Sequence, residues 1–283
     1  MPFTTCFRAP LVAGWLLAAV HAIASAETVP VPDGFGVTPT RRLERLIYAE
    51  RTGELPNTVD RAGLEQVCRT SLQVGAATRM PVFEAGHDQP ARSRSQVYVS
   101  ADGLRRAAYT ELTAYGCPEV KRDGPCHCTY RPLVKHSVEI VVWQGRHFRR
   151  WKADVEDGTG TLEEGDGEPP GALPAPEDGA LARLFGPVVG RGAAAGWACA
   201  QRELPGAEAP RRTCLLLPDP KLPSMLHGRV ASSSAGAPDS PMRQRSDLQR
   251  LVLEADADAA VFTPPAAITW RGQRRAAPRD FQL

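Results

Sequence analysis

The stretch CPEVKRDGPCHCTYRPLVKH, residues 117–136, carries three cysteines and two histidines within twenty residues. Thiolates and imidazoles at close spacing can bind zinc, exchange disulfides or, as paired cysteines, form structural bridges. Zinc needs four ligands in tetrahedral reach, which Cys117, Cys126 and Cys128 could supply together with His127 or His136. Copper bound by the histidines at 127, 136 and 147 is a second alternative.

The spacing within this stretch favours disulfides over a metal or redox centre. The pattern C-x8-C-x-C lacks the CxxC pair of zinc sites and thioredoxin-like exchange, and it lacks the CxxCH of haem attachment. Cys126 and Cys128 would point the same way on an extended strand, so they need different partners. Cys117 and Cys68 are the candidates. We therefore expect no cofactor, and a metal-binding or redox protein centred on Cys117–His136 stays an alternative.

Residues 1–26 predict a secretory signal peptide that is cleaved near Ala26. Arg8 is followed by an apolar run, Leu11 to Ala24, which is shorter than the roughly 20 residues that a spanning helix needs. The small residues Ala24-Ser25-Ala26 fit a cleavage site. We expect export to the periplasm and no transmembrane segment in the mature chain.

Cleavage changes the number of cysteines. The chain has seven, of which Cys6 leaves with the signal peptide. An even set then reaches a compartment where disulfides persist, so we expect three bridges. The expected disulfide cysteines are Cys68, Cys117, Cys126, Cys128, Cys199 and Cys214. Cys199 and Cys214 are placed to be neighbours across one hairpin.

The pattern of the mature chain predicts an α+β fold. Residues 27–37 form a Pro- and Gly-rich flexible lead, and residues 38–283 form one domain. Thr38-Pro39 is typical of a helix start, and an apolar stripe follows at Leu43, Leu46 and Ile47. A second helix is expected in NTVDRAGLEQVCRTSLQ, where the helical spacing puts Cys68 on the buried side. A bridge from Cys68 would pin this helix to a sheet.

From residue 96 the hydrophobic period changes to two, which predicts antiparallel strands. QVYVS and LRRAAYTEL flank a turn and form one expected hairpin. SVEIVVW and RHFRRWKADV flank Gln144-Gly145, and a two-residue turn there would place Trp143 opposite Arg146 and Val141 opposite Phe148. The expected fold is a curved, mainly antiparallel, half-barrel-like sheet with N-terminal helices packed on it, stabilised by disulfides.

The composition of two segments predicts flexible surface loops. Residues 154–180 are acidic and rich in proline and glycine, and we expect a solvated loop there. Residues 232–245 form a second flexible segment. Between them, ALARLF predicts a short helix, and GWACAQREL with RRTCLLLP predicts a disulfide-closed hairpin.

Charge and motifs exclude several function classes. The net charge of +2 gives no global field that would recruit nucleic acid, so we expect no nucleic-acid partner. The chain contains no GxSxG, HExxH, P-loop or SxxK pattern. The cluster RHFRRWK interleaves cations with aromatic residues, but Arg stems that cover apolar surface explain it more simply. We expect no catalytic residue that the sequence can identify.

Three stretches carry a resemblance: VYVSADGLRRAA, then VVGRGAAAGWACAQREL with RRTCLLLPDPKLP, then DADAAVFTPPAAITW. In this order they resemble markers of bacterial exported proteins related to the lipoprotein-carrier type of half-barrel. The resemblance implies a curved antiparallel sheet with helices on its concave side and a cavity for an acyl chain or a protein segment. The extra cysteines Cys117, Cys126 and Cys128 and the acidic insertion depart from the pattern. The matching positions are turns and packing positions, so no functional residue is carried over.

These observations predict a periplasmic binding protein without catalysis, which holds an apolar, lipid-like ligand or a segment of an envelope protein. The expected ligand-binding residues are Trp143, Phe148 and Trp151, because neither face of their hairpin is cleanly polar. Besides the metal or redox alternative, the remaining hypothesis is an envelope structural or interaction protein without a small-molecule site.

Overall fold

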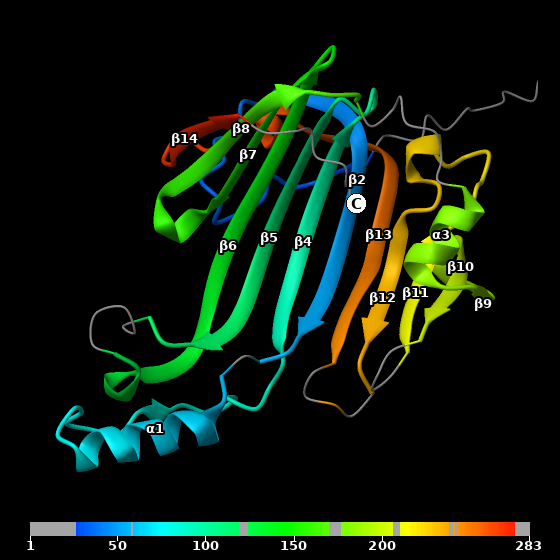
Figure 1. Cartoon of the computed structure of the whole chain (residues 1–283). Helices are drawn as coiled ribbons and strands as arrows, with labels where there is room; N and C mark the ends of the chain where they lie inside the picture. Colours follow the sequence, from blue (N-terminus) through cyan, green and yellow to red (C-terminus); the bar gives the residue numbers. More distant parts are fainter. Residues whose placement is uncertain are drawn as a thin grey trace, which may run out of the picture.

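One large antiparallel sheet dominates the chain (Figure 1). The computed structural model describes residues 27–57, 59–118, 124–169, 177–205, 210–237, 240 and 243–274. The expected signal peptide, residues 1–26, lies outside the described residues.

The fourteen-stranded sheet follows a single path with two short strands beside it. From edge to edge the path runs β14 (Thr269–Arg274), β8 (Thr159–Asp166), β7 (His147–Asp154), β6 (Thr129–Gln144), β5 (Arg105–Gly116), β4 (Ala91–Ser100), β2 (Leu43–Leu55), β13 (Gln244–Asp258), β12 (Val230–Ala235), β11 (Arg211–Leu216), β10 (Trp197–Leu204) and β9 (Val188–Ala194). The short strands β1 (Glu27–Thr28) and β3 (Val82–Phe83) pair in parallel with β13 and β6. β14 is also parallel to its neighbour β8, and the other pairs are antiparallel.

Few helices accompany this sheet. The described helices and 3-10 turns are α1 (Arg61–Gln73), α3 (Asp178–Phe185), η1 (Pro125–His127), η2 (Val155–Asp157), η4 (Ser224–Leu226) and η5 (Ala259–Phe262). The expected α+β class with N-terminal helices packed on the sheet is therefore wrong, because the described chain is nearly all β. The fold is a large curved antiparallel sheet carrying three disulfides.

The helix expected after Thr38-Pro39 is instead the central strand β2. Four consecutive residues, Leu46 to Ala49, are buried, whereas an amphipathic helix buries one stripe. A strand that is covered on both faces buries such a run, and this pattern resembles helical spacing when it is short. The second expected helix is present as α1, with Cys68 buried, but it lies beyond the end of the strands (Figure 1).

The two expected hairpins are present, with one change of register. β4 and β5 pair as expected, and β6 pairs with β7. The turn of the second hairpin is Gly145-Arg146, one residue later than Gln144-Gly145, so Trp143 lies opposite Phe148. Gly145 has φ +62°, which glycine adopts without strain, and this conformation places the turn.

The three segments expected to be flexible are partly built into the sheet. The lead, residues 27–37, contributes β1 and buries Val29 and Phe35. The acidic segment 154–180 begins with η2 and then forms β8, whose glutamates pair with the arginines of β7. Segment 232–245 contains most of β12 and the start of β13. Cross-strand ion pairs and main-chain pairing therefore override the turn-like composition.

The sheet has two faces, because side chains alternate along each strand and paired residues share a side. We call one the tyrosine face, after Tyr48, Tyr98 and Tyr109, which are buried on it. We call the other the arginine face, after its inward cations. It carries Arg51, Arg106, Arg150 and Arg202.

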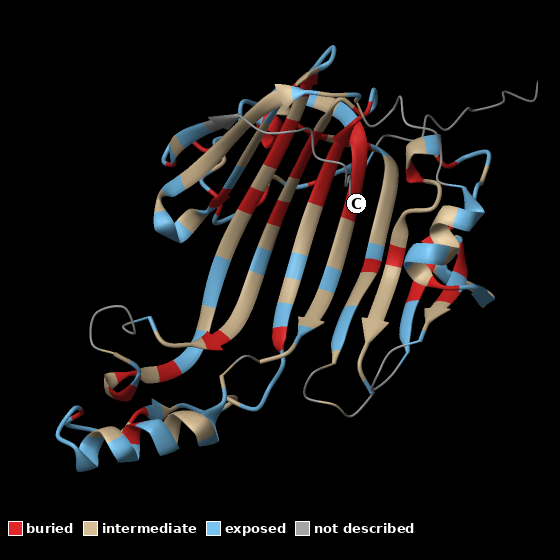
Figure 2. Ribbon diagram, viewed as in Figure 1, coloured by how far each residue is buried: buried red, intermediate tan, exposed pale blue. Residues whose placement is uncertain are grey.

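The tyrosine face is covered by the two ends of the described chain. In Figure 1 the blue lead and the orange to red C-terminal segment pass behind the upper part of the sheet. Tyr98 donates a hydrogen bond to the Pro30 carbonyl at 2.7 Å, and Tyr109 donates one to the Val261 carbonyl at 2.6 Å. Figure 2 shows that burial is concentrated in this upper part and that the lower parts of the strands are more exposed.

Asp258 fastens the two covering segments to each other. Its carboxylate accepts hydrogen bonds from Thr40 Oγ1 at 2.7 Å and from the Arg41 and Ala260 amides at 2.6 and 2.9 Å. Burial acts to raise the pKa of this carboxyl, but the hydrogen bonds outweigh it and lower the pKa to about 2.

This carboxylate should make the fold acid-sensitive. The folded pKa lies below the usual value of 3.8, so the stabilisation is complete above about pH 4 and is lost as the pH falls toward about 2. Asp258→Asn should lower the free energy of unfolding at pH 7 by about 1–2 kcal/mol, after allowance for solvent screening, and weaken its dependence on pH below 4. Urea unfolding at pH 7, 4 and 2.5 measures both.

The control is Asp256→Asn on the same strand, whose carboxylate lies 3.6 Å from the Arg45 guanidinium in a more exposed pair. That change should cost less than about 1 kcal/mol. If Asp258→Asn kept the acid-dependent loss of the unchanged protein, Asp258 would not be its source.

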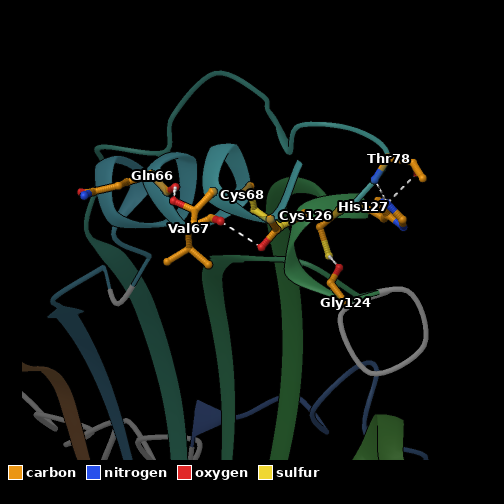
Figure 3. The surroundings of a disulfide bond; sticks show 10 residues. Gln66, Val67, Cys68, Thr78, Gly124, Cys126 and His127 are labelled. Atoms are coloured by element: carbon orange, nitrogen blue, oxygen red, sulfur yellow. Dashed lines mark hydrogen bonds between the residues drawn. A yellow bond between two sulfur atoms is a disulfide. The ribbon is translucent and has the colours of Figure 1, made fainter. Parts of the chain in front are cut away.

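Three disulfides close the described chain. They join Cys68 to Cys126, Cys117 to Cys128, and Cys199 to Cys214. The hairpin neighbours Cys199 and Cys214 are thus paired as expected, and Cys126 and Cys128 take different partners. Figure 3 shows the first bridge joining α1 to η1, which leads into β6. Cys68 is the only residue of α1 that is fully buried, and Leu64 packs against Tyr115 and Tyr130, so the bridge adds a covalent link to a small contact.

Removing that bridge should release α1 without unfolding the sheet. In a Cys68→Ser/Cys126→Ser variant we expect the amides of 61–73 to exchange at least tenfold faster with deuterium, while those of β4 and β5 keep their protection. Hydrogen exchange read by peptide mass spectrometry measures both regions. A matched Cys199→Ser/Cys214→Ser variant should leave α1 protected. Unchanged protection of α1 in the first variant would show that packing alone holds it.

Candidate functional site

The three residues expected to bind a ligand do not form one site. Trp143 and Phe148 lie on the arginine face with ring centroids 5.3 Å apart, and they are 3% and 0% exposed. They form a small core with Val141 and Leu104. Trp151 lies on the tyrosine face, where it packs against the main core. These aromatic side chains are packing residues of two separate cores.

The cysteine and histidine stretch is built as structure around two bridges. Because its cysteines are oxidised, they offer no thiolate to a metal. The Nε2 atom of His127 lies 2.9 Å from the Thr78 hydroxyl (Figure 3). His136 Nδ1 lies 2.7 Å from the Glu156 carboxylate. Among the described residues, no group of three or more histidine, cysteine, aspartate or glutamate side chains is placed to hold a metal ion.

The His136 contacts also fix Glu156. Burial acts to raise the pKa of Glu156, but hydrogen bonds from the backbone amide and the ring of His136 lower it overall. His136 also stacks edge-on against Phe35 of the lead, with ring centroids 4.9 Å apart. The pair therefore holds the lead against β6, a structural role.

The arginine face is covered by a loop and by α3. Leu222 and Leu226, in and before η4, pack on Ile47, Val97 and neighbouring side chains of the central strands. Farther along the sheet, α3 lies in front of β10 and β11 (Figure 1). The two covers leave a cleft between α3 and the sheet.

This cleft, which we call the α3 cleft, has a volume of about 340 Å³. Its apolar wall is formed by one residue of α3, the first of β9, and residues of β10, β11 and the loop after β11. They are Leu181, Val188, Ala200, Leu215, Leu217 and Pro218. The polar groups at the cleft come from Asp178, Arg191, Arg202 and His227.

A buried arginine positions α3 over the sheet. Arg202 of β10 is 3% exposed, donates to the Gly186 carbonyl at 2.9 Å and forms an ion pair with Asp178 at the start of α3. The negative charge of Asp178 in the first turn of α3 also interacts favourably with the positive end of the helix dipole. Gly186 ends α3 with φ +80°, and a Cβ atom at this position would collide with the backbone of Glu203. Arg202 and Gly186 therefore fix both ends of the helix.

Exposed apolar side chains surround the α3 cleft. Leu184 on α3 is 63% exposed, and Val188 and Val189 at the start of β9 are 52% and 59% exposed. Isolated exposed apolar residues are ordinary, but Val188 lines the apolar cleft at the edge of the sheet. β9 is the last strand of the sheet path, so in the described part of the chain its outer edge carries no further strand.

A larger polar cavity of about 620 Å³ lies on the tyrosine face across β9–β13. Its charged side chains pair with one another: Arg212 lies 3.0 Å from Glu203, and Arg245 pairs with Asp247. The mixed, paired charges are typical of a solvated surface, so we place the candidate site at the α3 cleft.

The sequence contained part of the signal for this site. ALARLF was expected as a short helix and is α3, and the hairpin of β10 and β11 was also expected. The sequence did not show which face of the sheet α3 covers. Arg202 was an available signal, because its charge on a strand with alternating apolar residues needs a partner, and that partner must come from outside the sheet.

Comparison with known proteins does not assign the chain to a family. No family model and no curated protein matches the chain. Among solved structures, the chain is similar to one described as the structure of PNGF-II, with 6% identity and a TM-score of 0.34. The match covers 82% of this chain and 32% of that one, so the chain spans about a third of its length. Among the described residues, no helix is long and apolar enough to cross a membrane.

Proposed function

We propose that the chain is an exported, periplasmic binding protein without catalytic activity, which holds an apolar, lipid-like ligand in the α3 cleft. The observation that carries this proposal is the cleft itself. It has an apolar wall on a face whose other apolar side chains are covered, and a volume within the range of small-molecule sites.

The polar groups of the cleft suggest how such a ligand would be oriented. Arg191 and His227 can meet a polar or anionic end, while Leu181 and Leu215 contact an apolar body. A few polar groups in a mostly apolar site set orientation more than affinity. An amphiphile with one apolar chain is the class of ligand that fits.

A segment of an envelope protein is the second candidate occupant. It is favoured by the outer edge of β9, where the exposed Val188 lines the cleft. An extended segment could add to this edge and insert an apolar side chain beside α3. Such a partner would compete with an apolar ligand for one site.

Filling the cleft should abolish binding of a neutral apolar dye. Ala200 is buried and lines the cleft, so Ala200→Phe should occupy its volume and weaken binding of N-phenyl-1-naphthylamine at least tenfold. Ala198 lies on the same strand, is exposed and does not line the cleft, so Ala198→Phe is the matched control. Fluorescence titration of the dye measures both, and circular dichroism checks the fold.

Leu181→Glu is a second variant, because it changes the helix side of the cleft and leaves the sheet intact. It should also lower dye affinity at least tenfold by placing a charge in the apolar wall. Dye affinity that is unchanged in both folded variants, or lost equally in Ala198→Phe, would reject the proposed site.

A further inference from the structure

A second cavity lies on the arginine face, and its chemistry differs from that of the α3 cleft. It has a volume of about 310 Å³ and is lined by residues of β2, β4, β5, β6, β7 and β13. Apolar side chains cover much of this face, yet this cavity is lined mainly by cations and hydroxyl groups.

The strand register brings the hydroxyl groups together. Arg51 of β2 pairs with Ser95 of β4, Ser95 with Thr110 of β5, and Thr110 with Ser137 of β6. A cation and three hydroxyls thus form one row across four strands. The Ser95 and Thr110 hydroxyl oxygens lie 2.8 Å apart. Hydroxyl groups can rotate and donate to an anion, so the row is a set of adaptable donors.

Two further cations lie beside this row. Glu139 and Lys152 occupy the next row on β6 and β7, and Arg106 of β5 lies one row farther along. Arg51 is held in place by its bonds to the Val230 carbonyl at 2.7 Å and the Ser246 hydroxyl at 3.1 Å. The cavity is therefore surrounded by positive charge from three strands.

The carboxylates nearby are shared among arginines. Glu139 accepts from Arg106 at 3.3 Å and from Arg150 at 3.1 Å, and Arg150 also reaches Glu163 at 3.4 Å. Asp247 acts on Arg51 from β13 but forms its ion pair with Arg245. The lining itself contains Arg51, Arg106 and Lys152 against the single carboxylate of Glu139, a net charge of +2.

Burial makes the two arginines, Arg51 and Arg106, unfavourable for stability alone. Arg106 is 8% exposed, and burial lowers the pKa of the Arg106 and Arg51 guanidinium groups from their usual value. Taking such charges out of water costs several kcal/mol, and apolar side chains of similar size stabilise an interior at least as well. Arginine and hydroxyl donors converging on a cavity are instead the groups that bind oxyanions.

We propose that this cavity binds a phosphate group. A phosphate monoester carries a charge between about −1.5 and −2 near neutral pH, which matches the lining, and its three oxygens accept several charge-assisted hydrogen bonds. Arg51 lies at one end of the hydroxyl row, and Lys152 and Arg106 lie in the next two rows along the strands. The inference is independent of the α3 cleft, whose ligand is apolar.

Isothermal titration calorimetry of the full chain with inorganic phosphate and with glycerol 1-phosphate, at constant ionic strength, tests the proposal. Lys152→Gln removes an exposed cation, and Thr110→Val removes one hydroxyl at similar volume. Each should weaken binding at least tenfold. Lys135→Gln is the matched control, because Lys135 is exposed on the same face of β6 and does not line the cavity.

Binding of inorganic phosphate that both variants weaken and the control keeps would support a site for the free ion. Binding of glycerol 1-phosphate alone, with the same variant pattern, would support a site for a phosphorylated small molecule. No binding of either anion, or equal weakening in the Lys135→Gln control, would overturn the proposal. Thermal unfolding of each variant without ligand shows whether it is folded.

Discussion

The structure depends on one constraint: a wide open sheet must bury apolar side chains on both faces, and the described residues form few helices with which to cover them. The tyrosine face is covered by the two ends of the described chain, which Asp258 ties together. The arginine face is covered by the loop around η4 and by α3. Each cover is short and held by a few specific bonds rather than by a large interface.

The two proposed sites lie where these covers end. The α3 cleft forms because an eight-residue helix covers only part of the apolar surface of β10 and β11. The proposed phosphate cavity lies where the arginine face is lined by cations and hydroxyl groups. An apolar and an anionic site on one face would suit a ligand or ligands of opposite character, and each can be removed without the other.

The spacing of residues within short segments predicted the structural features that depend on neighbouring residues alone. The hairpin neighbours Cys199 and Cys214, the helix α1 and the alternating strands around residue 140 follow from spacing alone. The local pattern does not predict strand β2, because distant segments bury it. The two ends of the described chain cover Leu46 and Tyr48, and the loop around η4 covers Ile47 and Ala49. The turn at Gly145 was displaced by one residue, which changed the pairs but left each side chain on its expected face.

The residues predicted to bind a ligand do not come together, for a similar reason. Trp143, Phe148 and Trp151 are large and apolar, but their strands lie where the sheet is covered on both sides. The α3 cleft joins residues 181, 200 and 215. The pairing of β10 with β11 brings 200 and 215 together, and the bonds of Arg202 to Asp178 and Gly186 add the helix. The sequence shows which side chains are large and apolar, but it does not show which faces of the sheet other segments cover.

Photolabelling tests the account most directly. The full chain would be irradiated with a neutral alkyl diazirine, and the modified peptides would be located by mass spectrometry. The account predicts labels at Leu181, Val188 and residues 215–218, which line the α3 cleft. Labels concentrated in the hairpin of residues 138–151, or spread evenly over exposed apolar residues, would contradict it.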